Sequence, residues 1–335
     1  MGRKRTKRLL KKRVAAVLIV LVIAACALFA QKMDSWLFAP VENAGQQLTV
    51  YSNQADGAHV FMNGVWHTPR NVQTMLLIGI DKFSGTQTTN SYNNSSQADF
   101  LALFVHDTDT GENAVIHLNR DTMTRITVLG VTGDAAGTRT AQLALAYNYG
   151  SGAADSCQNT VEAVSHLLYS VEIDHYLAVT MDSVPLINDW AGGVKVTVAD
   201  DFSGVDEALT PGSEVVLRGE QALTYVRTRM GLDDSTNLQR MKRQRQYASA
   251  WVDAARPKLS DESAVMQLVM DMSDYHYSDC TAEQLAQFAD MLSGDGEVVI
   301  HELSGQAVQG DQFMEFYASD EQVQQLVLNL FYKPL

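Results

Sequence analysis

Five short runs of almost uninterrupted apolar residues constrain the fold of this 335-residue chain more than any other feature. A strand with one face in water alternates apolar and polar side chains, whereas a strand buried on both faces is apolar nearly throughout. The runs lie at residues 74–80, 100–105, 113–118, 175–180 and 194–199. We therefore expect these segments to be strands of a sheet that is buried on both faces.

Helical patterns fall between these runs. Residues 140–148 and 159–169 place apolar side chains three and four positions apart, and residues 182–190 carry Pro185 where a first helical turn tolerates it. After Pro257, residues 257–335 are expected to be mainly helical and to pack on the same domain. Strands interleaved with helices predict the α/β class, here a layered mixed β-sheet flanked by helices.

The N-terminus has the composition of a membrane anchor. Residues 1–13 contain eight Lys and Arg and no acid, and residues 14–30 carry no charge. Because a helix needs about 20 apolar residues to cross a bilayer, we predict a transmembrane signal anchor at residues 14–34. A cleaved signal peptide is the alternative, but its apolar core is shorter. Residues 35–71 are expected to form a juxtamembrane linker with one strand pair near residues 60–66.

The distribution of charge fixes the expected topology and limits the partners. The positive-inside rule leaves the basic tail in the cytoplasm and everything after about residue 35 outside, in a single-pass protein of the cell membrane. The formal net charge is −14, and without the eight basic residues of the tail it is −22. Such an acidic exterior argues against nucleic acid as a partner.

The cysteines and histidines give weaker signals. Cys26 lies in the predicted anchor, whereas Cys157 and Cys280 lie outside it, where a disulfide between them is permitted. No Cys/His spacing resembles a zinc site, and the eight histidines are interpreted as structural or surface groups.

One basic cluster stands out in this acidic chain. Residues 217–245 hold six arginines and one lysine against three acids, a local net charge of +4. The guanidinium fork binds phosphate oxygens bidentately, so the cluster indicates a phosphate pocket. A solvated helix face with ion pairs is the alternative explanation.

Acidic residues near strand ends supply the rest of a candidate site. Asp81 follows the run at 74–80, and Asp121, next to Arg120, follows the run at 113–118. Asp99 immediately precedes the run at 100–105, so antiparallel pairing of the first two runs would bring Asp99 near Asp81. Converging carboxylates are stabilised by a shared proton or by a hard divalent cation such as Mg²⁺. For each aspartate alone, a turn or helix cap is the structural explanation.

Eight ordered motifs then give a resemblance to a known family. They read LLIGID (76–81), QADF (97–100), HLNRDT (117–122), YNYGSG (147–152), DHYLAV (174–179), GGVKV (192–196), LRGEQALTYVRTR (217–229) and NLQRMKRQ (237–244). In order and spacing they resemble the LytR-CpsA-Psr family over about residues 72–256. Ser151 and Arg218 depart from the usual motifs, and residues 230–239 lack the usual Gly-Asp pair.

The resemblance implies a membrane-anchored phosphotransferase of a Gram-positive-type bacterium. It implies transfer of a glycopolymer, of teichoic acid or capsular type, from a polyprenyl pyrophosphate carrier to a sugar hydroxyl of peptidoglycan. A polyprenyl pyrophosphate phosphatase and a non-catalytic sensor of lipid-linked precursors are the alternatives. The expected cofactor is Mg²⁺, with Mn²⁺ as its substitute.

The same resemblance assigns roles to individual residues. Asp81 and Asp99 become the metal ligands, and the general base is either Asp121 or one of these two. The expected catalytic residues are Arg120, Asp121, Arg227 and Arg229. The expected pyrophosphate-binding residues are Arg120, Arg227, Arg229, Arg240, Arg243 and Gln244.

Overall fold

The computed structural model describes the chain from residue 51 onward, with gaps. It describes residues 51–52, 59–62, 64–81, 94–130, 133–228, 237–259, 271–280, 298–311 and 313–335, together with isolated residues between 261 and 291. The predicted basic tail and signal anchor lie outside the described residues. No helix within the described ranges is long and apolar enough to cross a bilayer.

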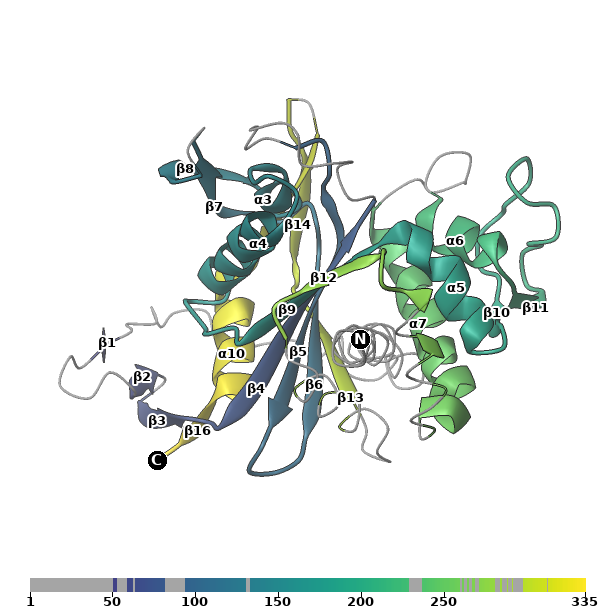
Figure 1. The fold of residues 1–335 in the computed structure, drawn as a ribbon. Helices are drawn as coiled ribbons and strands as arrows, with labels where there is room; N and C mark the ends of the chain where they lie inside the picture. The colour runs from purple at the N-terminus through teal and green to yellow at the C-terminus, as the bar shows by residue number, and fades with distance from the viewer. Residues whose placement is uncertain are drawn as a thin grey trace, which may run out of the picture.

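A six-stranded mixed sheet forms the centre of the molecule (Figure 1), in the order β12-β9-β4-β5-β6-β13. Strand β4 pairs antiparallel with β5 and parallel with β9, while β13 adds parallel to β6. The strands are β4 (Val72–Ile80), β5 (Ala98–Asp107), β6 (Asn113–Leu118), β9 (His175–Thr180), β12 (His276–Ser278) and β13 (Val298–Glu302). Both pairing senses occur, so the predicted mixed sheet is confirmed.

Helices cover both faces of this sheet, which explains the continuous apolar runs. Along β4, Met75 and Leu77 enter one hydrophobic core, and Leu76 and Ile78 enter the other. The first core is closed by α5 (Val184–Trp190), α6 (Glu220–Arg227) and α7 (Asn237–Leu259), and the second by α3 (Leu145–Asn148), α4 (Ala154–Leu167) and α10 (Asp320–Phe331). The two helix groups lie on opposite sides of the sheet in Figure 1.

Smaller sheets surround this core. β7 (Met123–Leu129) pairs with β8 (Ala135–Gln142), β10 (Val194–Thr197) with β11 (Glu214–Leu217), and β14 (Gly305–Gln309) with β15 (Met314–Ala318). A fourth sheet joins β1 (Tyr51–Ser52), β2 (Val60–Met62), β3 (Val65–Pro69) and β16 (Tyr332–Pro334). The strand pair expected near residues 60–66 is therefore present as β2 and β3.

Three expectations about secondary structure are wrong. The described part of residues 257–335 is not mainly helical, since β12 and β13 complete the two edges of the central sheet. Residues 140–142 belong to β8, because hydrogen bonds to β7 hold them extended, and the helix begins only at Leu145. Residues 194–197 form a strand outside the central sheet, with alternating buried and exposed side chains.

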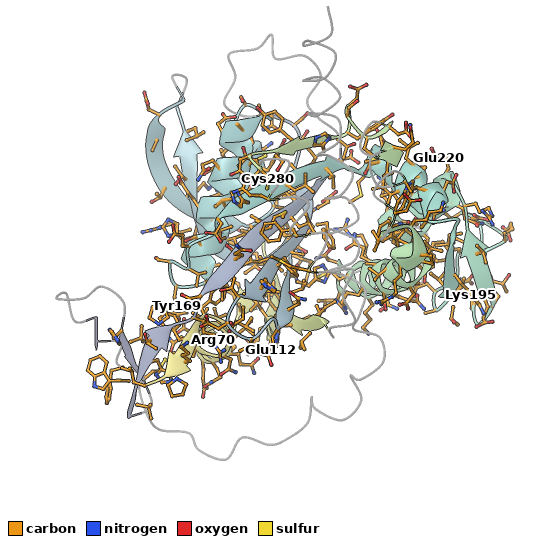
Figure 2. All side chains as sticks on the ribbon, turned by 60° about the horizontal axis from the view of Figure 1, so that its bottom comes forward. Arg70, Glu112, Tyr169, Lys195, Glu220 and Cys280 are labelled. Atoms are coloured by element: carbon orange, nitrogen blue, oxygen red, sulfur yellow. The ribbon has the colours of Figure 1, made fainter. Side chains whose placement is uncertain are left out.

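The cysteines do not form the permitted disulfide. Cys157 and Cys280 are both free. Cys157 is a residue of α4 and is fully buried in one core, whereas Cys280, labelled in Figure 2, lies just past β12 and packs against the other core. The sheet therefore separates the two thiols.

Candidate active site

The pairing of β4 with β5 places two of the predicted aspartates at one end of the sheet. Gly79 pairs with Phe100 and Ile80 with Ala98, so the register skips Asp99 as in a β-bulge. A bulge changes the direction of a side chain, and here the bulged residue is Asp99 of β5. It lies beside the end of β4, which Asp81 follows directly. Gly79 permits this close pairing, because a Cβ atom there would lie 2.8 Å from Cβ of Phe100. The antiparallel arrangement expected from the sequence is thus confirmed.

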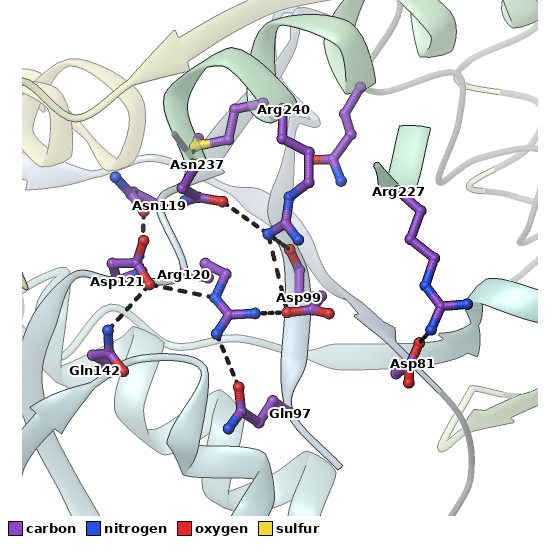
Figure 3. Close-up of polar contacts among 12 residues, drawn as sticks. Asp81, Gln97, Asp99, Asn119, Arg120, Asp121, Gln142, Arg227, Asn237 and Arg240 are labelled. Carbon is purple, nitrogen blue, oxygen red and sulfur yellow. Dashed lines mark hydrogen bonds and ion pairs between the residues drawn. The ribbon is translucent and has the colours of Figure 1, made fainter. Parts of the chain in front are cut away.

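Arg120 is the centre of the site (Figure 3). Its Nη1 forms an ion pair with Oδ1 of Asp99, its Nη2 donates to Oε1 of Gln97 at 2.9 Å, and its Nε donates to Oδ1 of Asp121 at 3.3 Å. Only 11% of the side chain is exposed. Three partners on three sides hold the guanidinium in one orientation before any substrate arrives.

A second arginine approaches the same carboxylate from helix α7. Arg240 is buried, and its Nη2 lies 4.0 Å from Oδ1 of Asp99 and 3.3 Å from the Asp99 carbonyl oxygen. The same Nη2 donates to Oδ1 of Asn237 at 2.8 Å. Asp99 therefore lies between two guanidinium groups from different elements.

Asparagine side chains close this arrangement into a ring. Asn237 Nδ2 donates to Oδ1 of Asn119 at 2.7 Å, and this oxygen also accepts the backbone N–H of Asp121 at 3.0 Å. Gln142 Nε2 donates to Oδ1 of Asp121 at 3.1 Å. We call Gln97, Asp99, Asn119, Arg120, Asp121, Gln142, Asn237 and Arg240 the Arg120 network. Its two asparagines and two glutamines were missed by the sequence reasoning, although Gln97, Asn119 and Asn237 lie inside the quoted motifs.

Arg227 and Asp81 form a separate and more open pair. Arg227, in the last turn of α6, places Nη2 at 2.5 Å from Oδ1 of Asp81. The side chains are 50% and 39% exposed, so a phosphate group could reach Arg227 by displacing an aspartate that water already solvates. In Figure 3 this pair lies beside the Arg120 network, with Asp81 and Asp99 each directed at its own arginine.

The guanidinium of Arg243 makes its contacts with other residues inside the protein. Its guanidinium pairs with Asp200, donates from Nε to the Tyr225 carbonyl at 3.0 Å, donates to the Thr228 carbonyl, and lies 5.5 Å from the centre of the Phe202 ring. None of these partners belongs to the Arg120 network. Gln244 is buried next to it, with Nε2 3.4 Å from the Val226 carbonyl. Both residues therefore hold α6 and α7 together in this structure, and Arg229 lies outside the described residues.

His117 is a neutral group close to Arg245 and Arg240. Its ring is buried against Phe100, with ring centres 5.1 Å apart, and its Nδ1 lies 3.3 Å from Nη1 of Arg245. Burial, followed by the charges of Arg245 and Arg240, lowers the pKa of His117 to about 3. The imidazole is uncharged at neutral pH and adds no positive charge to the site.

Two carboxylates at this end of the sheet are donors of the type that a hard divalent cation prefers. Asp81 and Asp99 offer carboxylate oxygens from one end of an antiparallel strand pair, which suits Mg²⁺ better than any nitrogen or sulfur set. Each carboxylate is also paired with an arginine, so a bound cation would share these oxygens with Arg120 and Arg227 or displace them.

A cavity of about 500 Å³ lies elsewhere in the described structure, between β2, β3, β16 and α10. It is lined by residues such as Arg70 and Leu328, and none of its lining residues belongs to the Arg120 network. The chemistry at the end of β4 and β5 therefore does not depend on this cavity.

Comparison with known proteins agrees with the resemblance found in the motifs. Residues 41–331 match the model of the LytR_cpsA_psr family. Biofilm regulatory protein A of Streptococcus mutans is 29% identical over 184 residues, covering 52% of this chain and 42% of that protein. The polyisoprenyl-teichoic acid–peptidoglycan teichoic acid transferase TagU of Halalkalibacterium halodurans is 27% identical over 177 residues, covering 53% of this chain and 51% of that protein. The matched regions thus span about half the length of these relatives.

Solved structures show the same fold. The crystal structure of TagV from B. subtilis superposes with a TM-score of 0.59 at 20% identity, covering 78% of this chain and 97% of that one. TagT bound to LIIa-WTA superposes with a TM-score of 0.58 at 21% identity, covering 77% of this chain and 89% of that one. The layered α/β architecture is therefore shared with these proteins.

Proposed function

Because the chain belongs to the LytR_cpsA_psr family, we propose that it transfers a glycopolymer from a polyprenyl pyrophosphate carrier to a sugar hydroxyl of peptidoglycan. The name of the relative TagU describes this type of reaction with teichoic acid. The observation that carries the proposal is the fixed orientation of Arg120 between Asp99, Gln97 and Asp121, with Arg240 and Arg227 beside it.

In the proposed reaction the sugar hydroxyl oxygen attacks the phosphorus that carries the glycopolymer. A new P–O bond forms, the bond to the bridging oxygen of the pyrophosphate breaks, and polyprenyl phosphate leaves. Charge builds up on the phosphoryl oxygens and on the leaving phosphate, where pre-oriented arginines stabilise it most. Arg120 would bind the buried side of the pyrophosphate, and the half-exposed Arg227 would close on it from the open side.

Mg²⁺ is the proposed cofactor, with Mn²⁺ as its substitute, and Asp81 and Asp99 are its proposed ligands. Bound there, the ion would neutralise the pyrophosphate and stabilise the leaving group. Removal of divalent cations with a chelator is expected to stop transfer, and addition of Mg²⁺ to restore it. Asp81→Asn and Asp99→Asn should raise the Mg²⁺ concentration required.

The general base must lie close to the acceptor hydroxyl. Asp121 accepts hydrogen bonds from Arg120 and Gln142 through Oδ1, which makes it a good orienting group for Arg120. Asp81 is the more accessible carboxylate, at 39% exposed. We therefore propose Asp121 as a positioning residue, and Asp81 as the better candidate for the proton acceptor.

Product analysis tests this function. Full-length protein in detergent would be incubated with a labelled polyprenyl pyrophosphate sugar, Mg²⁺ and peptidoglycan fragments, and both polyprenyl phosphate and labelled peptidoglycan would be measured. Arg120→Ala should abolish both products. Arg125→Ala is the matched control. Arg125 lies on β7, is exposed, and its guanidinium is within hydrogen-bond distance of His166 on α4.

Either of two other results would contradict the transferase proposal. Release of polyprenyl phosphate with no label in peptidoglycan would identify a phosphatase. Tight binding of the carrier with neither product would identify a sensor of lipid-linked precursors.

A further inference from the structure

Three potential metal ligands meet at the β9–β12 edge of the central sheet. His175 opens β9, and Asp279 and Cys280 follow the last residue of β12. One ligand atom from each residue lies within 4.8 Å of the other two. They form the one group of three or more His, Cys, Asp or Glu ligands found among the described residues.

The distances within this group match a coordination shell. Oδ1 of Asp279 lies 3.6 Å from Nδ1 of His175 and 3.9 Å from Sγ of Cys280. Around a tetrahedral zinc ion, bonds of about 2.0–2.3 Å separate neighbouring ligand atoms by roughly 3.4–3.6 Å. A shift of a few tenths of an ångström would bring both pairs to those values.

The contacts behind the ligands hold the imidazole ring in place. The His175 ring packs edge-on to Phe288, and its Nε2 lies 2.7 Å from the amide nitrogen Nε2 of Gln284. Rotation of this amide by 180° would put its oxygen in that position, so that His175 Nε2 donates to it and Nδ1 keeps its lone pair for a metal. Nδ1 is buried and has no hydrogen-bond partner within the described residues. In that tautomer the Nδ1 lone pair faces the carboxylate of Asp279, 3.6 Å away.

The carboxylate is also held in place. Oδ1 of Asp279 accepts the backbone N–H of Tyr176 at 3.0 Å, and the turn is fixed by Ser278, whose hydroxyl donates to the Tyr176 carbonyl at 2.7 Å. A lone pair and a carboxylate at 3.6 Å repel each other unless a proton or a cation lies between them.

We propose that His175, Asp279 and Cys280 bind a zinc ion, with a water molecule in the fourth position. Nitrogen, oxygen and sulfur together suit Zn²⁺, and the sulfur ligand excludes Mg²⁺ as the preferred occupant. Binding replaces the S–H bond with a Zn–S bond and releases one proton to solvent.

The zinc site is distinct from the candidate active site. His175 pairs with Met75, and Ile80, the last residue of β4, lies five positions further along the strand. At about 3.3 Å per residue this separation is roughly 16 Å. The ion would join the short edge strand β12 to β9.

Cobalt spectroscopy on the full-length protein in detergent tests the proposal. Co²⁺ titration should produce a thiolate-to-cobalt charge-transfer band that saturates at one equivalent and disappears when one equivalent of Zn²⁺ is added. Cys280→Ser should abolish the band, whereas Cys157→Ala should retain it, because Cys157 lies in the other core.

A second variant is needed because Cys280→Ser could also lose the band by misfolding. Asp279→Asn keeps the size of the side chain and should weaken Zn²⁺ binding by at least the tenfold to hundredfold typical for loss of an outer-shell partner. Circular dichroism would establish that each variant is folded. Absence of the band in the wild-type protein, or its persistence in Cys280→Ser, would overturn the proposal and leave a His175–Asp279 ion pair as the explanation of the contact.

Discussion

Replacing Arg120 with lysine separates the role of the guanidinium fork from the role of its charge. Lysine keeps the positive charge and can still reach Asp99, but one ammonium group has no planar fork with which to satisfy Gln97 and Asp121 as well. The change removes the 2.9 Å hydrogen bond to Gln97 and the 3.3 Å hydrogen bond to Asp121.

The expected cost follows from these two contacts. Hydrogen bonds that involve a charged group contribute about 1.5–3 kcal/mol each, and the longer of the two belongs at the weak end of that range. Because Arg120 is only 11% exposed, water replaces the lost contacts poorly. We expect Arg120→Lys to lower the free energy of unfolding by roughly 3–4.5 kcal/mol. The transfer rate should fall about a hundredfold, as for loss of one pre-oriented donor.

Urea unfolding followed by circular dichroism measures the first quantity, and labelled-donor transfer measures the second. Arg125→Lys is the matched control, because Arg125 is exposed, and it should change the unfolding free energy by less than about 0.5 kcal/mol. If Arg120→Lys also stays within that margin and transfers at the wild-type rate, the guanidinium fork has no special role and the reasoning fails.

Three further perturbations test separate parts of the structure. Gly79→Ala should destabilise the protein by about 1–3 kcal/mol in urea unfolding, because the new Cβ would lie 2.8 Å from Cβ of Phe100, whereas Gly137→Ala, which meets no atom within 4 Å, should be nearly neutral. Arg227→Ala should leave the unfolding free energy within about 1 kcal/mol of wild type, because the ion pair is half exposed. It should nevertheless lower the transfer rate about a hundredfold. A loss of unfolding free energy as large as the increase in the activation free energy of transfer would contradict this prediction. The depressed pKa of His117 means that the unfolded chain binds a proton between about pH 6.5 and 3 while the folded protein does not. Stability should therefore fall as the pH falls through this window, by up to about 1.4 kcal/mol per pH unit, and His117→Gln should flatten the slope in urea unfolding at several pH values.

The sequence was sufficient for the central strands because burial on both faces leaves a local signature. Residues 74–80, 100–105, 113–118 and 175–180 all lie in the central sheet. The edge strand β12 was missed because it has no such local signature. β12 has three residues, none of them fully buried, and its pairing depends on β9, about 100 positions earlier in the chain. No local pattern reports such a partner.

The candidate site was also predicted from the sequence only in part. The motifs located Asp81, Asp99, Arg120, Arg227 and Arg240, and the structure brings Asp99, Arg120 and Arg240 together. The motifs gave no indication that the guanidinium of Arg243 is directed to Asp200, because charge type alone does not give direction. The register that skips Asp99 was also outside the reach of the sequence, since a bulge depends on the pairing of two strands.

The zinc proposal shows the same limit. His175 and Cys280 are 105 positions apart, so no short Cys/His spacing could indicate the site. Antiparallel pairing of β12 with β9 brings them together, with Ser278 opposite Leu177.

A crystal structure with a non-reactive polyprenyl pyrophosphate analogue and Mg²⁺ tests the central claim most directly. We predict that the pyrophosphate lies within hydrogen-bond distance of Arg120 and Arg227, with the metal bound to Asp81 and Asp99. Binding of the pyrophosphate elsewhere, for example beside Arg70 in the cavity between β3 and α10, with the Arg120 network unchanged, would contradict it.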